Sequence, residues 1–438
     1  MVASKSTIET AQLVRFVREA RQRSLELVAD LTPEQLRGPR LAIVNPLHWE
    51  IGHVAWFQES WVLRHGLGER PLRADGDALW DSSAIPHDTR WDLALPSIAD
   101  TKAYMSEIRD RVGERLSHGA PDARLVYLAL YTVFHEDMHD EAFTYTRQTL
   151  AYPAPRLSGS VDDVDDGGGA LPGDACVPGG TFRLGAKADE PFVFDNEKWA
   201  HPVVIAPFAI ARATVTQREF AGFVEDGGYR RPELWSEAGW AWRASVNAEH
   251  PVYWRRAGSG WERRHFDRFS PLEPHRPVIH VSWHEAQAYC RWAGRRLPTE
   301  AEWEAAAALE PGTGAGFAPR KRRFPWGDDA TTAERANLDA RAMGCLDVGA
   351  LPAGDSAFGC RQMLGNVWEW TADDFLPYPG FVPDMYSDYS EPWFRTHKVL
   401  RGGCWVTRAR LLRNSWRNYY TPDRRDVWAG FRTCALQR

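Results

Sequence analysis

The spacing of hydrophobic residues in the first third of the chain predicts helices. Apolar residues recur at near-helical intervals over residues 13–27, and Thr32-Pro33 is typical of a break followed by a capped helix start. The Pro- and Asp-rich stretch Trp80–Pro96 is too long for a simple turn, and a long loop in a compact bundle is more often functional than filler. Four helices with moderate to long connections predict a helix bundle. The three later helices are predicted over Pro46–His65, Ile98–Leu116 and Asp122–Leu150.

The composition changes near residue 156. Ser158–Asp174 is rich in Gly and Asp and has no periodicity, which is typical of a linker. Beyond it the chain is rich in Gly, Pro, Trp and Arg, and only short elements are predicted. The chain is therefore predicted to be an α+β protein of two domains, a helical domain (1–155) and an irregular α+β domain (176–438), joined by a linker (156–175). The predicted short elements are strands at Thr181–Leu184, Val203–Ile205 and Pro277–Ser282, and helices at Thr216–Glu225 and Trp283–Ala293.

The charge balance disfavours a nucleic-acid partner, and the short apolar runs disfavour a membrane-spanning protein. The 438 residues include 53 basic and 59 acidic ones, a net charge of −6, whereas nucleic-acid binders carry a basic excess. The basic run Arg408–Arg417 is therefore expected to be solvated or paired with carboxylates. No apolar run reaches the roughly 20 residues that span a bilayer. The polar N-terminus has no signal-peptide core, and the six widely spaced cysteines are expected to be buried, reduced thiols, so we predict a cytoplasmic protein that acts on small molecules.

The strongest chemical signal is the pair His135 and His139 in a predicted helix. Spacing of i, i+4 places both imidazoles on one face, where they can bind one divalent metal ion, while Glu136 lies off that face. A third ligand is needed, and His53 follows the inward spacing of its own helix, whereas His48 is interpreted as a helix-entry residue. Three neutral imidazoles suit zinc and iron equally well, so the ligands alone leave the metal open.

Longer motifs carry a resemblance to known families. One His on the second helix and HxxxH on the fourth resemble the metal site of DinB-type four-helix bundles. RLPTEAEWE (Arg296–Glu304) and GNVWEW (Gly365–Trp370) resemble the formylglycine-generating-enzyme-like (sulfatase-modifying factor) domain, which has a C-type-lectin-like fold. The combination is similar to the EgtB family of non-haem iron sulfoxide synthases, which use O2 to join a sulfur donor to the imidazole C2 of hercynine. It looks most like the selenoneine synthase (SenA) branch of that family.

The resemblance implies roles for individual residues. It makes His53, His135 and His139 the ligands of one Fe(II), O2 the co-substrate, and a structural Ca²⁺ a further possible ion. The run Tyr386–Phe394 is similar to the family's YxxYSxPxF motif, in which the first Tyr is the proton donor. Tyr386 is thus the predicted catalytic residue. The residues implied to bind hercynine are Met138, Tyr389, Asn418 and Tyr419, and those implied to bind the chalcogen donor are His87, Arg90, Tyr420 and Arg424.

Departures from the family pattern bear on the donor. Members that use γ-glutamylcysteine carry an arginine at the position of His87, an acidic residue at that of Tyr420 and a glutamine at that of Met138. Loss of one positive and one negative charge disfavours a dipeptide, whose charges need partners when buried. The changes favour a neutral selenosugar as the donor, which would give selenoneine. The alternative is a C–S bond formed from cysteine or γ-glutamylcysteine, on the ergothioneine pathway.

Three other functions compete with this one. A DinB-type metal-dependent thiol transferase would leave the second domain without a role. Formylglycine generation needs a pair of reactive cysteines, and the late glycine-rich segment supplies only Cys404 before Cys434. A lectin-like binding module without catalysis would leave the three histidines unexplained.

Overall fold

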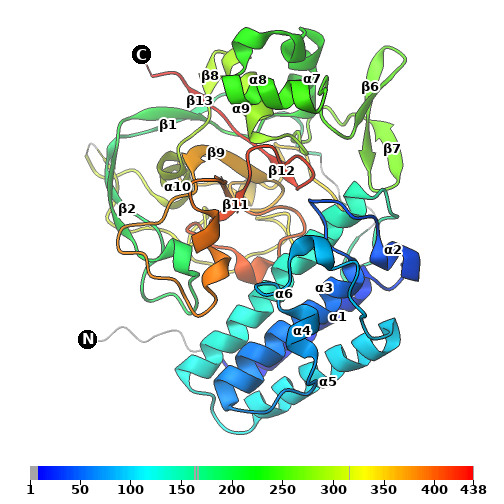
Figure 1. Cartoon of the computed structure of the whole chain (residues 1–438). Coiled ribbons are helices and arrows are strands. Elements are labelled where there is room, and N and C mark those ends of the chain that lie inside the picture. Colours follow the sequence, from blue (N-terminus) through cyan, green and yellow to red (C-terminus); the bar gives the residue numbers. More distant parts are fainter. Residues whose placement is uncertain (1–7, 162–163, 165–166, 315, 438) are drawn as a thin grey trace. The chain divides into compact units, whose positions relative to one another are not determined.

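The computed structural model describes residues 8–161, 164, 167–314 and 316–437, and the chain forms two compact units (Figure 1). The bundle unit is the chain up to Ser158 together with Asp189–Phe192, and the mixed unit is Gly159–Ala188 with Val193–Arg438. The combination of a helical bundle with a sheet-containing unit confirms the α+β prediction. Among the described residues, no helix combines the length and the apolar character needed to cross a bilayer.

Four helices form the core of the bundle unit. Helices α1 and α3 each pack against both α5 and α6. The α1 face buries Leu13, Val17, Ala20 and Leu27, whose spacing is that of one helical stripe, so the periodicity read from the sequence is confirmed. The helices of this unit are α1 (Thr10–Leu27), α2 (Pro33–Arg37), α3 (Leu47–Gln58), α4 (Gly76–Trp80), α5 (Ile98–Ser117) and α6 (Ala123–Thr149).

Local sequence signals set the helix ends. Thr32 caps α2 in a reciprocal capping box with Gln35, and Asp122 caps α6 by accepting a hydrogen bond from the Leu125 N–H. The helix predicted over Pro46–His65 is confirmed, but it changes type within that range, because α3 ends at Gln58 and Glu59–Gly66 continues as a π-helix. The carboxylate of Glu59 is buried there and accepts hydrogen bonds from Tyr104 and from the Leu72 backbone.

The described part of the mixed unit contains four small sheets. Their strand orders are β1-β4-β13-β8, β11-β10-β9-β12, β2-β3 and β5-β6-β7. In the second sheet β10 lies antiparallel between β9 and β11, with Val399 opposite Tyr419. The strands are β1 (Asp174–Val177), β2 (Gly180–Leu184), β3 (His201–Ile205), β4 (Phe208–Ala211), β5 (Trp254–Ala257), β6 (Gly260–His265), β7 (Arg268–Pro271), β8 (Arg295–Arg296), β9 (Trp368–Asp374), β10 (Lys398–Arg401), β11 (Asn418–Tyr420), β12 (Ala429–Gly430) and β13 (Cys434–Ala435).

The helices that accompany these sheets in the described residues are α7 (Gln217–Glu225), α8 (Glu237–Ser245), α9 (Trp283–Trp292) and α10 (Glu300–Ala308). The predicted caps Thr216 and Ser282 are confirmed, each in a capping box. The predicted strand Pro277–Ser282 is wrong. Pro277 makes one isolated bridge to Thr216, and the positive φ of His280 (61°) turns the chain before a ladder can form.

The Gly-rich stretch expected to be a linker packs, in its described parts, on the mixed unit. The Val161 N–H donates to the Arg341 carbonyl, the Gly169 N–H donates to the Asp347 carboxylate, and the Gly349 N–H donates to the Gly169 carbonyl. Gly168 approaches Ala350 so closely that a Cβ there would overlap the backbone, so glycine is required at this contact.

Candidate functional site

The three predicted histidine ligands come together inside the bundle unit. His53 lies on α3, and His135 and His139 lie one turn apart on α6. One ligand atom from each lies within 4.8 Å of the other two, and this is the one such group of three or more metal-binding side chains found among the described residues. His48, the other candidate on α3, is not in the group, because its Nε2 lies 3.2 Å from Thr101 Oγ1 on α5.

Hydrogen bonds behind two of the rings fix their orientation. His53 Nδ1 donates to the Trp80 carbonyl (2.8 Å), and His139 Nδ1 donates to the carboxylate of Glu50 (3.0 Å). Because both partners are acceptors, each ring carries its proton on Nδ1 and keeps the Nε2 lone pair for a metal. A carboxylate or carbonyl behind a ligating imidazole is the usual outer partner of a protein metal site.

The third ring is held by packing. Phe57 stacks on His135 with ring centroids 3.7 Å apart, and His135 Nδ1 is buried without a hydrogen-bond partner in the described structure. An orphaned ring nitrogen beside two other imidazoles fits a metal ligand. Burial, reinforced by the neighbouring imidazoles, lowers the pKa of His53 and His135 well below the usual value, which favours the neutral, metal-binding form.

The spacing of the rings fits a first-row metal ion. With bonds near 2.1 Å, three nitrogens on one ion lie about 3.0 to 3.5 Å from one another. The ligand atoms of the three rings lie within 4.8 Å of one another, so metal binding would draw the rings about 1 Å closer together. The three imidazoles are neutral ligands, and the carboxylate that contacts them, that of Glu50, is 2% exposed and bonded to His139. The residues present thus fit a mononuclear metal.

Arg90, a predicted donor-binding residue, is connected to the histidine group. Its guanidinium lies 4.1 Å from the ring of Trp49, which in turn stacks on His53 at 4.8 Å. Its Nη1 also donates to Asn45 Oδ1 (2.7 Å), and Asn45 Nδ2 donates to Glu50 (3.3 Å). A continuous chain of contacts therefore runs from Arg90 to both His53 and, through Glu50, His139.

The other predicted residues of the bundle unit are placed differently. His87 lies in a short 3₁₀ turn, where its Nε2 donates to the Val44 carbonyl (2.8 Å). Met138 precedes His139 on α6 and is half-buried. Glu136 faces away from the ligands, as expected, and forms a fully buried ion pair with Arg21 of α1 (2.7 Å). The back of α6 is therefore held by buried charges while its front carries the imidazoles.

In the mixed unit the predicted aromatic residues gather in one cluster. Tyr389 lies edge-on to Tyr419 with ring centroids 6.2 Å apart, and Tyr419 stacks on Phe375 at 4.0 Å. Burial raises the pKa of Tyr419 well above the usual value, with contributions from nearby Tyr389 and Tyr386. Asn418 begins β11 and is half-buried. Four predicted residues, Tyr386, Tyr389, Asn418 and Tyr419, thus share one region.

The two remaining predicted donor-binding residues form a pair of their own. The Arg424 guanidinium lies 5.1 Å from the ring of Tyr420. Both of its nitrogens Nε and Nη2 also donate to Asp426 (2.6 and 2.7 Å), a bidentate ion pair. The charge of Arg424 is therefore already compensated within the unit.

Sequence reasoning missed two groups of residues beside these candidates. Glu50 precedes His53 by three positions, so the spacing that selected His53 also placed Glu50 near the same face. The second group is a buried turn, Asp195–Glu197, that contacts Ser390 in the segment carrying Tyr386 and Tyr389. The local sequence does not indicate the role of this turn, because its partner Ser390 lies 195 positions further along the chain.

The basic run and the cysteines are structural. Arg413 and Arg417 form buried ion pairs with Glu197 and Glu300, which confirms carboxylate pairing for part of that run. All six cysteines are free, and five are buried. The expectation of burial is wrong for Cys176, which is exposed on the outer strand β1. Burial raises the pKa of the Cys360 thiol to about 11, which keeps it unreactive at neutral pH.

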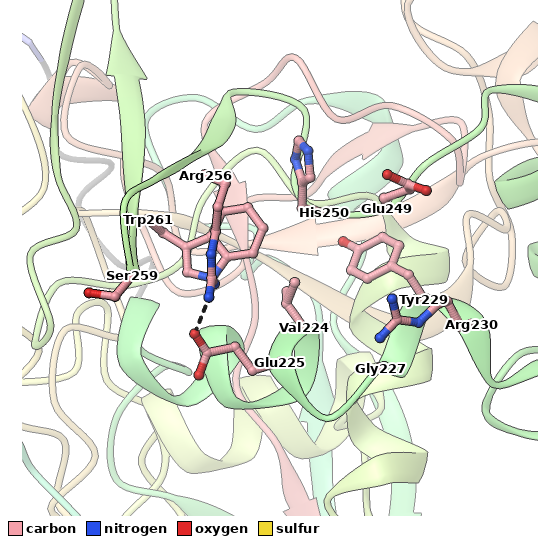
Figure 2. A pocket seen from close by; sticks show the side chains of 10 residues that line it. All are labelled: Val224, Glu225, Gly227, Tyr229, Arg230, Glu249, His250, Arg256, Ser259 and Trp261. Atoms are coloured by element: carbon pink, nitrogen blue, oxygen red, sulfur yellow. Dashed lines mark hydrogen bonds and ion pairs between the residues drawn. The ribbon is translucent and has the colours of Figure 1, made fainter.

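A separate cavity of about 690 Å³ lies in the mixed unit (Figure 2). It is lined by the end of α7, the following turn and the β5–β6 hairpin, and none of the predicted site residues lines it. Arg256 and Glu225 form an ion pair across it (3.2 Å), and Arg256 also lies over the ring of Trp261 (5.1 Å). Its basic and acidic side chains largely compensate each other.

Comparisons with known proteins cover both units. Residues 165–436 match the sulfatase-modifying factor enzyme 1-like domain, and residues 17–143 match the DinB superfamily. The chain is 41% identical over 431 residues to the hercynine oxygenase of Mycolicibacterium thermoresistibile, covering 96% of this chain and 94% of that protein. It is 38% identical to the hercynine oxygenase of Mycolicibacterium smegmatis over 94% of this chain and 96% of that protein.

A more distant similarity is confined to the second unit. The formylglycine-generating enzyme of Thermomonospora curvata is 32% identical over 294 residues, which cover 60% of this chain and 93% of that enzyme. The hercynine oxygenases, in contrast, match almost end to end and at higher identity. With its DinB domain followed by a sulfatase-modifying factor domain, the chain belongs to the EgtB-type family that includes the hercynine oxygenases.

Proposed function

We propose that this protein is an Fe(II)- and O2-dependent enzyme that joins C2 of the hercynine imidazole to a chalcogen donor. The observation that carries the proposal is the group of three imidazoles, two of which have Nδ1 facing a hydrogen-bond acceptor. The similarity to proteins named hercynine oxygenase over nearly the whole chain supports the substrate and the use of O2. Zinc fits the same ligands, so the ligands alone do not select the metal. Iron is favoured because the similar proteins are named oxygenases.

The proposed reaction balances with O2 as the only oxidant. The C2–H bond of hercynine and the Se–H or S–H bond of the donor break, and one C–Se or C–S bond forms. One oxygen atom becomes water and the other ends on the chalcogen, so O2 takes up four electrons. When bound, Fe(II) supplies the centre at which O2 reacts, and three protein ligands leave coordination positions for substrates.

The protein's own residues bind and orient the substrates. Tyr389, Asn418 and Tyr419 are proposed to hold the betaine end of hercynine, since aromatic faces attract quaternary ammonium groups. Met138, one residue before His139 on α6, is proposed to contact the same substrate. Tyr386 is proposed as the proton donor, a role for which a phenol is suited because it can release a proton and regain it.

A selenosugar is the proposed donor. His87 and Tyr420 replace charged family residues, and Arg424 is already neutralised by Asp426 (2.6 Å), so the carboxylates of a dipeptide would have to break an existing ion pair. Arg90 bonds to the neutral oxygen of Asn45. Hydroxyl groups match such partners without a net charge to compensate. A selenol is also largely ionised at neutral pH and binds a metal without a separate base.

A direct competition tests the donor. Hercynine, O2, selenoglucose, cysteine and γ-glutamylcysteine are supplied together, and the products are separated by mass. The selenium product is expected to dominate. In the matched variant His87→Arg, which restores the missing positive charge, the share of γ-glutamylcysteine product is expected to rise. A wild-type preference for either thiol would overturn the selenosugar assignment and leave the iron and hercynine chemistry standing.

Glu50→Gln is expected to weaken Fe(II) binding by about 10- to 100-fold, the usual effect of removing an outer-sphere carboxylate. The amide retains the shape of Glu50 but loses the negative charge that faces His139, whose Nδ1 lies 3.0 Å from Glu50 Oε1. Affinity is measured by anaerobic Fe(II) titration. Glu59→Gln is the matched control, because Glu59 is equally buried but bonds to Tyr104 and Leu72. Equal losses in both variants would refute a specific role for Glu50.

A further inference from the structure

The segment that carries Tyr386 and Tyr389, which we call the tyrosine segment, contains a single fully buried residue. Between Tyr378 and Val399 every side chain is exposed or half-buried except Ser390, which is fully buried. The segment has no regular structure beyond two 3₁₀ turns, Ser387–Tyr389 and Glu391–Trp393. The segment is also linked to the rest of the unit by the Lys198–Asp384 ion pair (2.5 Å) and by the ring contact of Phe394 with Phe375 (4.8 Å), but Ser390 makes its one fully buried contact.

Ser390 is bound by the turn Asp195–Glu197, which we call the anchor turn. The Ser390 hydroxyl donates to Asp195 Oδ1 (2.5 Å) and accepts a hydrogen bond from Asn196 Nδ2 (3.1 Å). The other carboxylate oxygen of Asp195 accepts a hydrogen bond from the backbone N–H of Asp384 (3.4 Å), which lies earlier in the same segment. The anchor turn therefore holds the tyrosine segment at two points.

The anchor turn is itself fixed by the chain that leads to Asn418 and Tyr419. All three residues of the turn are fully buried. Arg413 forms a buried ion pair with Glu197, and Ser415 Oγ donates to the same carboxylate (2.9 Å). Arg417, the residue before Asn418, donates to the carbonyl of the middle residue of the turn (2.7 Å). The turn therefore forms hydrogen bonds both with the tyrosine segment and with residues 413–417, which lead into β11.

We propose that the anchor turn is a positioning element that sets Tyr386 and Tyr389 relative to Asn418 and Tyr419, with the Asp195–Ser390 hydrogen bond as its decisive contact. The inference rests on the proposed function for its catalytic consequence. Phe194, which precedes the turn, supports it by stacking on Tyr389 with ring centroids 4.7 Å apart. A displacement of about 1 Å in a reacting group costs on the order of 100-fold in rate, so displacement of the tyrosine segment is expected to lower kcat.

Three variants separate the elements of this contact. Ser390→Ala removes the hydroxyl and with it the hydrogen bonds to Asp195, Asn196 and Tyr419, whereas Asp195→Ala removes both acceptor oxygens of the anchor turn and leaves the Tyr419 contact. Asp195→Asn keeps one oxygen that can accept from Ser390 but loses the acceptor for the Asp384 N–H, so it isolates the Ser390 contact. The matched control is Glu391→Gln, which removes an exposed carboxylate next to Ser390.

The first readout is amide hydrogen exchange in the full-length, metal-free protein, which does not depend on the reaction. In Ser390→Ala, exchange across residues 379–398 is expected to accelerate at least about 10-fold, while exchange in the bundle helices and the melting temperature stay close to wild type. Glu391→Gln is expected to remain near wild type, and Asp195→Asn is expected to fall between wild type and Ser390→Ala. Unchanged exchange in Ser390→Ala would overturn the proposal. Should Asp195→Ala unfold, Ser390→Ala still decides the outcome.

The second readout is the amount of coupled product formed per O2 consumed in Fe(II)-loaded protein. Ser390→Ala is expected to retain iron and to lose at least about 10-fold in kcat, with O2 diverted to oxidation of the donor alone. A variant that gains mobility but keeps wild-type kcat and coupling would refute the positioning role. If the wild type forms no product from hercynine, the proposed function is wrong. The hydrogen-exchange comparison would still test whether the anchor turn orders the tyrosine segment.

Discussion

His135→Ala is expected to lower Fe(II) affinity at least about 100-fold and to abolish O2-dependent turnover. Loss of an outer-sphere partner alone costs up to about 100-fold in metal affinity, and this change removes a ligand itself. The rings of His53 and His139 would remain, but two imidazoles hold a metal ion poorly. The variant also leaves a cavity beside Phe57, which stacks on His135 at 3.7 Å, so its melting temperature is measured alongside iron content.

His48→Ala is the control for the ligand assignment. It removes a second imidazole from α3, one that contacts Thr101 rather than the other histidines, and it is expected to leave iron occupancy unchanged. His53→Ala is expected to behave like His135→Ala. Full iron occupancy in His53→Ala, together with loss in His48→Ala, would show that the wrong histidine of α3 has been assigned.

Tyr386→Phe is expected to bind Fe(II) and hercynine normally while the rate of C–Se or C–S bond formation falls by about 100-fold or more. The change removes one hydroxyl, and general acid catalysis contributes typically about 10²- to 10⁴-fold. O2 consumption is expected to continue with oxidation of the donor alone. Product and O2 are therefore quantified together in single-turnover experiments.

Tyr389→Phe is the matched variant for this test. Its ring keeps its contacts with Phe194 and Tyr419, so the change is expected to affect hercynine binding more than the chemical step. Undiminished coupling in Tyr386→Phe would move the role to Tyr389, or remove it if Tyr389→Phe is also active.

Local patterns in the sequence correctly predicted helical periodicity and helix caps. The buried stripe of α1 has helical spacing, and the caps Thr32, Thr216 and Ser282 are side chains that bond to the backbone three residues on. The same spacing rule selected His53 rather than His48. These features depend on residues a few positions apart, so one sequence contains the information.

Features that depend on distant partners escaped prediction. The strand expected at Pro277–Ser282 has the composition of a strand, but the fold offers it a single bridge partner, Thr216. The π-helical turn after α3 places Glu59 where Tyr104 bonds to it, and neither residue shows this in its local sequence. The anchor turn bonds to Ser390 across 195 positions, a contact that only the folded chain creates.

Hercynine-dependent O2 uptake tests the central claim most directly. The protein is loaded with Fe(II) without O2, hercynine and a chalcogen donor are added, and O2 consumption is followed together with the mass of the product. We expect rapid uptake of one O2 per hercynine consumed, loss of the C2 hydrogen, and no such uptake with Zn(II) in place of iron. Product formation with Zn(II), or O2 uptake that does not depend on hercynine and leaves it unchanged, would contradict the account.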